Sequence, residues 1–182
     1  MKILIFGVSN VGKTTAGKLL AERLGFSFYD LDEEVKCRLH TTLEAFVNSG
    51  NLKWRDQKRG EIIKEILLLK EDAVLVISPI SYPDSFKDEI ISDDILLIEL
   101  YDTPKNIFSR LVFSDENDVI YTDDVYKNEH KEFYMNDIQE DLEWYGKVYR
   151  SIGVKNRVFV SNQSPEKVVE RIITRFHLNK IN

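Results

Sequence analysis

The sequence contains a single cysteine, Cys37, and only three histidines. One cysteine makes an intramolecular disulfide impossible and leaves too few thiolates for a cysteine-based zinc site. We expect Cys37 to be an inert thiol in the core. The histidines lack the spacing of metal ligands, which indicates ordinary surface or core positions for His40, His130 and His177.

Long apolar runs and basic clusters are absent as well. No apolar stretch approaches the ~20 residues that a membrane-spanning helix needs, and residues 3–6 are too short a run for the core of a signal peptide. Lysine and arginine number 25 against 31 aspartates and glutamates, a net charge of −6, and no basic stripe indicates a nucleic-acid footprint. We therefore expect a cytoplasmic monomer that binds neither membranes nor nucleic acids.

What the sequence does contain is an alternation of short apolar runs with segments of helical periodicity. The runs, interpreted as buried strands, cover residues 3–6, 26–29, 73–77, 95–100 and 158–160, and helical spacing covers residues 13–24, 104–112 and 165–176. Strands that alternate with helices indicate a parallel sheet covered on both faces.

The same pattern predicts one domain over residues 1–182, with a helical region at about residues 31–70. Residues 113–134 are polar and lack periodicity, so they form an excursion from the core. A long polar stretch of this kind is typical of a mobile lid.

A glycine-rich motif links the first predicted strand to the first predicted helix. It fits the pattern G-x-x-x-x-G-K-[ST] at every fixed position, and with the next residue it comprises Gly7, Val8, Ser9, Asn10, Val11, Gly12, Lys13, Thr14 and Thr15. Backbone N–H groups and the positive end of a helix surround phosphate oxygens in such a loop. The motif predicts binding of ATP with Mg²⁺, with Lys13 on the β- and γ-phosphates and Thr14 on the metal. A glycine turn without a ligand is the alternative.

Two aspartates, Asp30 and Asp32, follow the second predicted strand. Ligands bind at the carboxyl ends of strands in open parallel sheets, so both carboxylates should lie beside the glycine-rich loop. A carboxylate–Mg²⁺–lysine cluster supplies the positioning and charge neutralisation that phosphoryl transfer needs. The competing interpretation is that both residues cap the next helix, since aspartate is a good N-cap residue.

The loop and its surroundings resemble the shikimate kinase family. The likeness rests on Phe28-Tyr29-Asp30-Leu31-Asp32, on Thr42-Leu43-Glu44-Ala45-Phe46 with Gly50 and Trp54-Arg55, and on later segments around Arg110-Leu111 and Ser164-Pro165. The resemblance implies a three-layer α/β/α P-loop kinase fold with a five-stranded parallel sheet, a substrate-binding helical region and a mobile lid. It also implies an ATP-dependent kinase that phosphorylates a hydroxyl group of a small molecule.

The same resemblance implies roles for four residues. Asp30 would help to hold Mg²⁺ through water, and Asp32 would accept a hydrogen bond from the substrate hydroxyl and act as, or orient, the base. Arg55 would bind an anionic group of the substrate, and Arg110 would lie over the adenine. A surface arginine on a basic helix is the alternative for Arg55, and packing near a helix end is the alternative for Arg110.

The chain departs from the family pattern where the acceptor should bind. Ser78-Pro79-Ile80 replaces a glycine triplet after the third strand, and Lys58 replaces a glutamate. No arginine occurs between Leu111 and Tyr149, and residues 115–143 contain eleven aspartates and glutamates against two lysines. We interpret most of this acidity as a solvated face, but such a segment would also repel the carboxylate of shikimate. The acceptor therefore stays open, and we expect poor turnover of shikimate.

Two other functions share the phosphate-binding loop. A nucleoside or nucleotide kinase is one, but a nucleotide acceptor needs several lid cations, which this chain lacks. A nucleotide-binding switch without phosphoryl transfer is the other. The altered segment after the third strand favours the switch, whereas the intact Lys13, Thr14, Asp30 and Asp32 speak against it.

Overall fold

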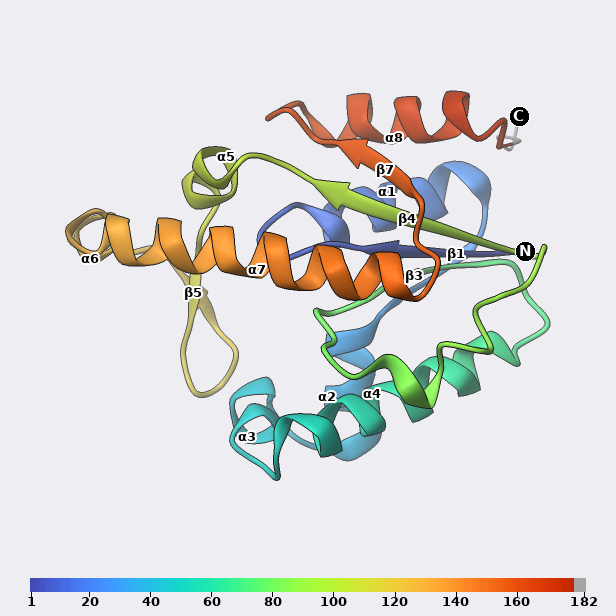
Figure 1. Cartoon of the computed structure of the whole chain (residues 1–182), viewed down its shortest axis with the longest axis horizontal. Coiled ribbons are helices and arrows are strands. Elements are labelled where there is room, and N and C mark those ends of the chain that lie inside the picture. The colour runs from blue at the N-terminus through green and yellow to red at the C-terminus, as the bar shows by residue number, and fades with distance from the viewer. Residues whose placement is uncertain (179–182) are drawn as a thin grey trace.

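The five predicted strands form one sheet in the computed structural model, which describes residues 1–178 (Figure 1). They are β1 (Lys2–Phe6), β2 (Ser27–Asp30), β3 (Ala73–Val76), β4 (Ile95–Tyr101) and β7 (Asn156–Phe159), in the spatial order β2-β3-β1-β4-β7. Every neighbouring pair in this sheet is parallel. The predicted five-stranded parallel sheet is confirmed.

The central strand β1 is apolar on both of its faces. Residues 3–6 are all buried, and Leu4 lies in register with Leu75 of β3 and Leu97 of β4. Parallel strands that are covered on both faces have nearly continuous apolar sequences. This is why the strands could be recognised from short apolar runs.

Three helices connect β2 to β3, in the region where the sequence predicts helices. They are α2 (Leu31–Leu39), α3 (Leu43–Val47) and α4 (Leu52–Leu67). The residue before each helix accepts a hydrogen bond from a backbone N–H of the first turn through its side chain; these residues are Asp30, Thr42 and Asn51. Such N-caps satisfy N–H groups that have no partner within the helix. They fix where each helix begins.

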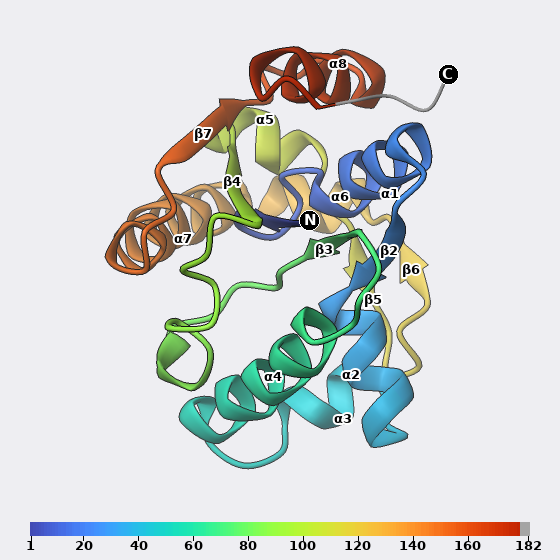
Figure 2. The same cartoon turned by 90° about the vertical axis from the view of Figure 1, so that its right-hand side faces the viewer.

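Helices on both faces complete the three layers. The remaining long helices are α1 (Lys13–Leu24), α7 (Lys131–Ser151) and α8 (Pro165–Arg175). Ile3 and Ile5 belong to the core under α1 and α8, whereas Leu4 and Phe6 belong to the core under α4 and the C-terminal end of α7. Figure 2 shows α1 and α8 on one side of the sheet and α4 on the other. The predicted three-layer α/β/α arrangement is confirmed.

Residues 113–134 contain a small hairpin and a short helix. β5 (Phe113–Ser114) pairs antiparallel with β6 (Ile120–Tyr121), and α6 (Asp124–Glu129) follows. Elements this short leave no readable periodicity in the sequence. The Asp118 carboxylate in the hairpin turn accepts a hydrogen bond of 2.8 Å from the backbone N–H of Leu43. The hairpin therefore contacts the start of α3, and its mobility stays a prediction.

Two details of the sequence interpretation are wrong. α5 (Pro104–Ser109) ends three residues earlier than the helical spacing indicated. Cys37 is exposed rather than buried in the core, because α2 turns Leu31 and Val35 inward and Cys37 lies on another face of the helix.

Within residues 1–178, no helix has the length and apolarity needed to cross a membrane.

Candidate active site

The glycine-rich loop joins the end of β1 to the start of α1, as predicted. Gly7 has φ 147°, and a Cβ atom there would lie 2.5 Å from the backbone oxygen of Leu100. Gly12 precedes α1 in the left-handed region, with φ 102°. Both positions therefore need glycine, the first because β4 approaches closely and the second because of its backbone conformation. The loop has the tight path that a phosphate-binding loop requires.

Within this loop the side chains separate into two groups. Val8 and Val11 are buried in the core, so only their backbone can face a ligand. Ser9 and Asn10 line a cavity, together with Lys13 and Thr14. Thr15 is exposed on the first turn of α1.

Lys13 is buried, and its ammonium group donates a hydrogen bond of 2.9 Å to the backbone oxygen of Val8. Burial lowers the pKa of Lys13 to about 8, against the opposing charges of Asp32, Asp30 and Asp141. A desolvated ammonium group is stabilised in its charged form by an anion placed beside it. The loop thus holds a buried ammonium group whose charged form a bound phosphate would stabilise.

Thr14 and Asp30 are joined by a hydrogen bond of 2.7 Å from the threonine hydroxyl to Oδ2 of the carboxylate. The other oxygen, Oδ1, accepts a hydrogen bond of 3.0 Å from the backbone N–H of Asp32. Asp30 therefore caps α2 and faces the loop at the same time, so the two interpretations of this residue are compatible. Burial raises the pKa of Asp30, and the hydrogen bond from Thr14 opposes this shift.

The hydroxyl of Thr14 and the carboxylate of Asp30 suit a Mg²⁺ ion that keeps part of its water shell. They do not form a site in which protein ligands enclose a metal ion completely. Residues 1–178 contain no cluster of three or more histidine, cysteine or acidic side chains that could enclose a metal ion. Mg²⁺ usually keeps several waters and binds through one or two carboxylates plus substrate phosphates. The neighbouring hydroxyl of Thr14 and carboxylate of Asp30 match that ligand set.

Asp32 lies at the first turn of α2 and is linked to the segment after β3. The Ser78 hydroxyl donates a hydrogen bond to Oδ1 of Asp32, and Ser78 is buried. The sequence indicated only that Ser78 replaces a glycine. The structure adds that its hydroxyl fixes one oxygen of the predicted catalytic carboxylate.

A cavity of about 400 Å³ brings these groups together. It is lined by the phosphate-binding loop, the start of α2, the segment after β3 and the hairpin; its polar lining includes Lys13, Asp30, Asp32, Ser78 and Asp118. The cavity lies at the carboxyl ends of the strands, where open α/β sheets bind ligands. We therefore take it as the candidate active site.

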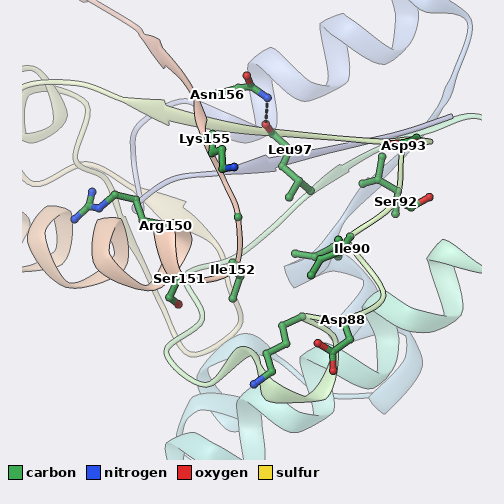
Figure 3. A pocket seen from close by; sticks show the side chains of 14 residues that line it. Asp88, Ile90, Ser92, Asp93, Leu97, Arg150, Ser151, Ile152, Lys155 and Asn156 are labelled. Atoms are coloured by element: carbon green, nitrogen blue, oxygen red, sulfur yellow. Dashed lines mark hydrogen bonds between the residues drawn. The ribbon is translucent and has the colours of Figure 1, made fainter.

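A larger cavity, of about 930 Å³, lies at the opposite end of the sheet (Figure 3). Its lining includes Ile95 and Asn156, the first residues of β4 and β7, as well as Arg150. No residue of the phosphate-binding loop lines it. This cavity is the larger of the two, but the side chains suited to phosphoryl transfer line the smaller one.

The two predicted ligand-binding arginines are both engaged within the chain. Arg55 donates hydrogen bonds of 3.2 Å to the backbone oxygens of Ser49 and Gly50, and it is not among the residues that line the cavity. Arg110 donates to the backbone oxygen of Asn10 at 3.1 Å and forms an ion pair of 2.8 Å with Asp102. Arg110 thus contacts the backbone of the phosphate-binding loop. Its position over the adenine stays a prediction.

The sequence interpretation missed a buried aspartate on α4. Asp56 is fully buried and accepts hydrogen bonds from the backbone N–H groups of Ser81 and Tyr82, at 2.9 and 3.0 Å. It also pairs with Arg59, one turn further along the helix, at 3.3 Å. This network holds the segment that carries Ser78 against α4. The only signal of this network in the sequence was an aspartate three residues before an arginine in a predicted helical region.

Solved structures of known proteins share this fold. The solved structure of shikimate kinase from Bacteroides thetaiotaomicron superposes with a TM-score of 0.77 and 22% identity, covering 98% of this chain and 99% of the other. A gluconokinase from Sinorhizobium meliloti 1021 gives 0.61 and 17%, covering 97% and 95%. Together with the family match given next, this fold defines an ATP-dependent kinase that phosphorylates a hydroxyl group.

The family model for shikimate kinase matches residues 9–177. Shikimate kinase from Persephonella marina is 29% identical over 175 residues, which are 95% of this chain and 97% of that protein. The chain belongs to the shikimate kinase family.

Proposed function

We propose that this chain binds ATP with Mg²⁺ in the cavity described above and phosphorylates a small-molecule hydroxyl compound there, with Asp32 facing the acceptor. The observation that carries the proposal is the convergence of Lys13, Thr14, Asp30 and Asp32 on one cavity. A lysine, a hydroxyl and two carboxylates at the carboxyl ends of parallel strands match the needs of phosphoryl transfer.

Each of these residues has a separate task in the proposed reaction. Lys13 would contact the terminal phosphate oxygens, and Thr14 and Asp30 would hold Mg²⁺ with the help of water. Mg²⁺, when bound, would supply positive charge to the phosphate oxygens. Asp32 accepts a hydrogen bond from the acceptor hydroxyl through the oxygen that Ser78 does not use, and so orients the hydroxyl and receives its proton.

The identity of the acceptor is a separate question from the type of reaction. The neighbours with this fold include proteins named as shikimate kinases and one named as a gluconokinase, so the scaffold supports more than one acceptor. Folds commonly host different substrates through changes in the site. The residues that differ from the family pattern should therefore decide which hydroxyl compound this chain accepts.

A coupled assay of ADP release tests the proposed reaction. The full chain is incubated with ATP, Mg²⁺ and a panel of hydroxyl compounds, and binding of an ATP analogue is followed in parallel by thermal shift. We expect an ATP-dependent increase in melting temperature and acceptor-dependent ADP release. Failure to bind the nucleotide would contradict the proposal. Nucleotide binding without release of ADP for any acceptor would favour the switch function.

A further inference from the structure

The segment after β3 carries one partner of the contact that orients Asp32, yet it belongs to no helix or strand. The pairing of β3 with β1 ends at Ile77, whose N–H donates a hydrogen bond of 2.9 Å to a backbone oxygen of β1. Residues 78–82 follow outside regular secondary structure. The first of them, Ser78, donates the hydrogen bond to Asp32. The position of this hydroxyl therefore depends on what holds residues 78–82.

α4 holds the segment from one side through Asp56. Its Oδ2 accepts hydrogen bonds of 2.9 and 3.0 Å from the backbone N–H groups of Ser81 and Tyr82, and its Oδ1 accepts one of 3.3 Å from Arg59. Asp56 is fully buried, where a carboxylate is costly without such partners. A buried polar network whose members all have partners favours a single arrangement. Asp56 thus fixes the backbone of residues 81 and 82 relative to α4.

α7 holds the same segment from the other side. The indole Nε1–H of Trp144 donates a hydrogen bond of 3.0 Å to the Ser81 hydroxyl. Ser81 is therefore bound to α4 through its backbone N–H and to α7 through its side chain. Figure 2 shows the chain after β3 passing between these two helices.

The connection from Ser81 back to Ser78 is short and stiff. Only Pro79 and Ile80 lie between them. The pyrrolidine ring of Pro79 locks its φ angle, and Ile80 is buried in the core under α4. A displacement of Ser81 would therefore move the Ser78 hydroxyl, and with it the hydrogen bond to Asp32.

We propose that Asp56 is a positioning residue for phosphoryl transfer, which orients the Asp32 carboxylate through Ser81 and Ser78. The inference rests on the proposed function, in which Asp32 faces the acceptor. Asp56 is not among the residues that line the cavity. Its hydrogen-bond partners within residues 1–178 belong to α4 and to the segment after β3. Loss of Asp56 should therefore lower kcat and leave KM for ATP unchanged.

Two substitutions of Asp56 separate positioning from stability. Asp56→Asn and Asp56→Ala both remove the charge that pairs with Arg59, so both should lower the melting temperature. Only asparagine keeps an oxygen that can accept from the N–H groups of Ser81 and Tyr82. We expect kcat to fall about five- to tenfold in Asp56→Ala, as for one lost hydrogen bond, and to stay within about twofold of wild type in Asp56→Asn.

A core variant controls for lost stability. Ile172 is fully buried under the other face of the sheet, in the core that α1 and α8 cover. Ile172→Ala should lower the melting temperature through the cavity that it leaves. At temperatures where it is folded, its kcat should equal that of wild type. All rates are measured on the full chain with ATP and Mg²⁺, with shikimate and gluconate as saturating acceptors.

A double variant tests whether Asp56 acts through Ser78. Residues that act through the same contact have non-additive effects. Asp56→Ala should therefore lower kcat little further in the Ser78→Ala background, where the hydrogen bond to Asp32 is already lost. If Asp56→Ala does not fold, the pair Asp56→Leu with Arg59→Leu takes its place, because it leaves no charge buried without a partner.

Hydrogen exchange tests the hold on the segment without any acceptor. The N–H groups of Ser81 and Tyr82 should be protected in wild type and in Asp56→Asn, and should exchange faster in Asp56→Ala. Rapid exchange of both groups in wild type would overturn the inference, whatever the rates of turnover are.

Three kinetic results would overturn the inference while leaving the kinase function in place. They are a wild-type kcat in Asp56→Ala, equal losses of kcat in Asp56→Ala and Asp56→Asn, and effects of Asp56→Ala and Ser78→Ala that multiply in the double variant. Absence of ADP release by the wild-type chain with every hydroxyl compound of the panel would instead contradict the proposed function itself.

Discussion

Ser78 and Asp32 each lie two residues beyond the end of a strand, and their side chains meet. Asp30 of β2 is in register with Val76 of β3, so the residues two positions further along both strands come out at the same edge of the sheet. There the Ser78 hydroxyl donates a hydrogen bond to Oδ1 of Asp32. Adjacent parallel strands thus bring together two groups that are 46 positions apart in the sequence.

Removal of this hydroxyl should reduce turnover without preventing nucleotide binding. Ser78→Ala frees Oδ1 of Asp32, so the carboxylate is oriented less well, and we expect kcat to fall about five- to tenfold, the effect of about 1–1.5 kcal/mol. KM for ATP should be unchanged. Ser78→Thr retains the hydroxyl and should restore most of the rate. Equal rates for the serine and alanine forms would show that Ser78 does not position Asp32.

Lys13→Ala should abolish turnover and weaken ATP binding. Lys13 is the buried cation of the phosphate-binding loop, and the other lysine of the cavity, Lys36, is paired with Glu33. Isothermal titration with an ATP analogue and a steady-state assay measure both effects. Lys18→Ala, on the solvent side of α1, serves as the control and should behave like wild type. Normal ATP affinity in Lys13→Ala would refute the assignment of the loop.

Asp32→Asn should lower kcat far more than it lowers ATP affinity. The amide can still accept a hydrogen bond from Ser78, but it cannot take a proton from the acceptor. Loss of a general base lowers rates by about 10²–10⁴-fold. Rapid-quench measurements at saturating acceptor give the transfer rate directly. An unchanged transfer rate would show that Asp32 takes no part in the chemistry and is only a residue of the first turn of α2.

The hairpin should become more ordered when ligands bind. We predict that hydrogen exchange in residues 113–134 slows when an ATP analogue and an acceptor are added, as expected of an active-site lid. The core strand β1 serves as the internal reference, because its residues are buried throughout. Exchange that is identical with and without both ligands would argue against a lid.

Asp141→Asn should stabilise the fold at neutral pH. The pKa of Asp141 is raised from 3.8 to about 6 by burial and by Asp137 and Glu140, with Lys13 opposing. A raised carboxyl pKa means that the folded state binds the proton more tightly than the unfolded state does. The free energy of unfolding therefore decreases as pH rises from about 4 to 6.

The asparagine variant lacks this penalty. After allowance for solvent screening of a partly buried group, we expect it to be about 1 kcal/mol more stable than wild type at pH 7.5. The difference should shrink as pH falls through 6 and vanish below about pH 4. Urea unfolding at several pH values measures it. A variant that is less stable at pH 7.5 would contradict the electrostatic explanation.

The strands and the phosphate-binding loop could be predicted because their signals are local. Residues 3–6 form a continuous apolar run, and Gly7 to Thr14 carry the whole loop motif within eight positions. The caps of α2 and α3 are also local, since an aspartate and a threonine each bond to a nearby backbone N–H. Such features depend little on what lies elsewhere in the chain.

The acceptor side could not be predicted in the same way, because it depends on contacts between distant segments. Ser78 meets Asp32 only through strand register, and Asp56 meets Ser81 only because α4 packs under that segment. The orientation of Arg55 is set by the backbone oxygens of Ser49 and Gly50 at the turn after α3. Carbonyl groups at the end of a helix lack partners and attract a nearby guanidinium group.

We predict that the hydrogen bond between Asp118 and the Leu43 N–H makes acceptor exchange dependent on the hairpin. Both residues line the cavity, and the bond joins its two sides, the hairpin and the start of α3. A molecule that enters or leaves on this side would then have to wait until the two residues separate. The maximal rate of the enzyme would then be set by how often this contact opens, and a slow cycle would be compatible with fast chemistry.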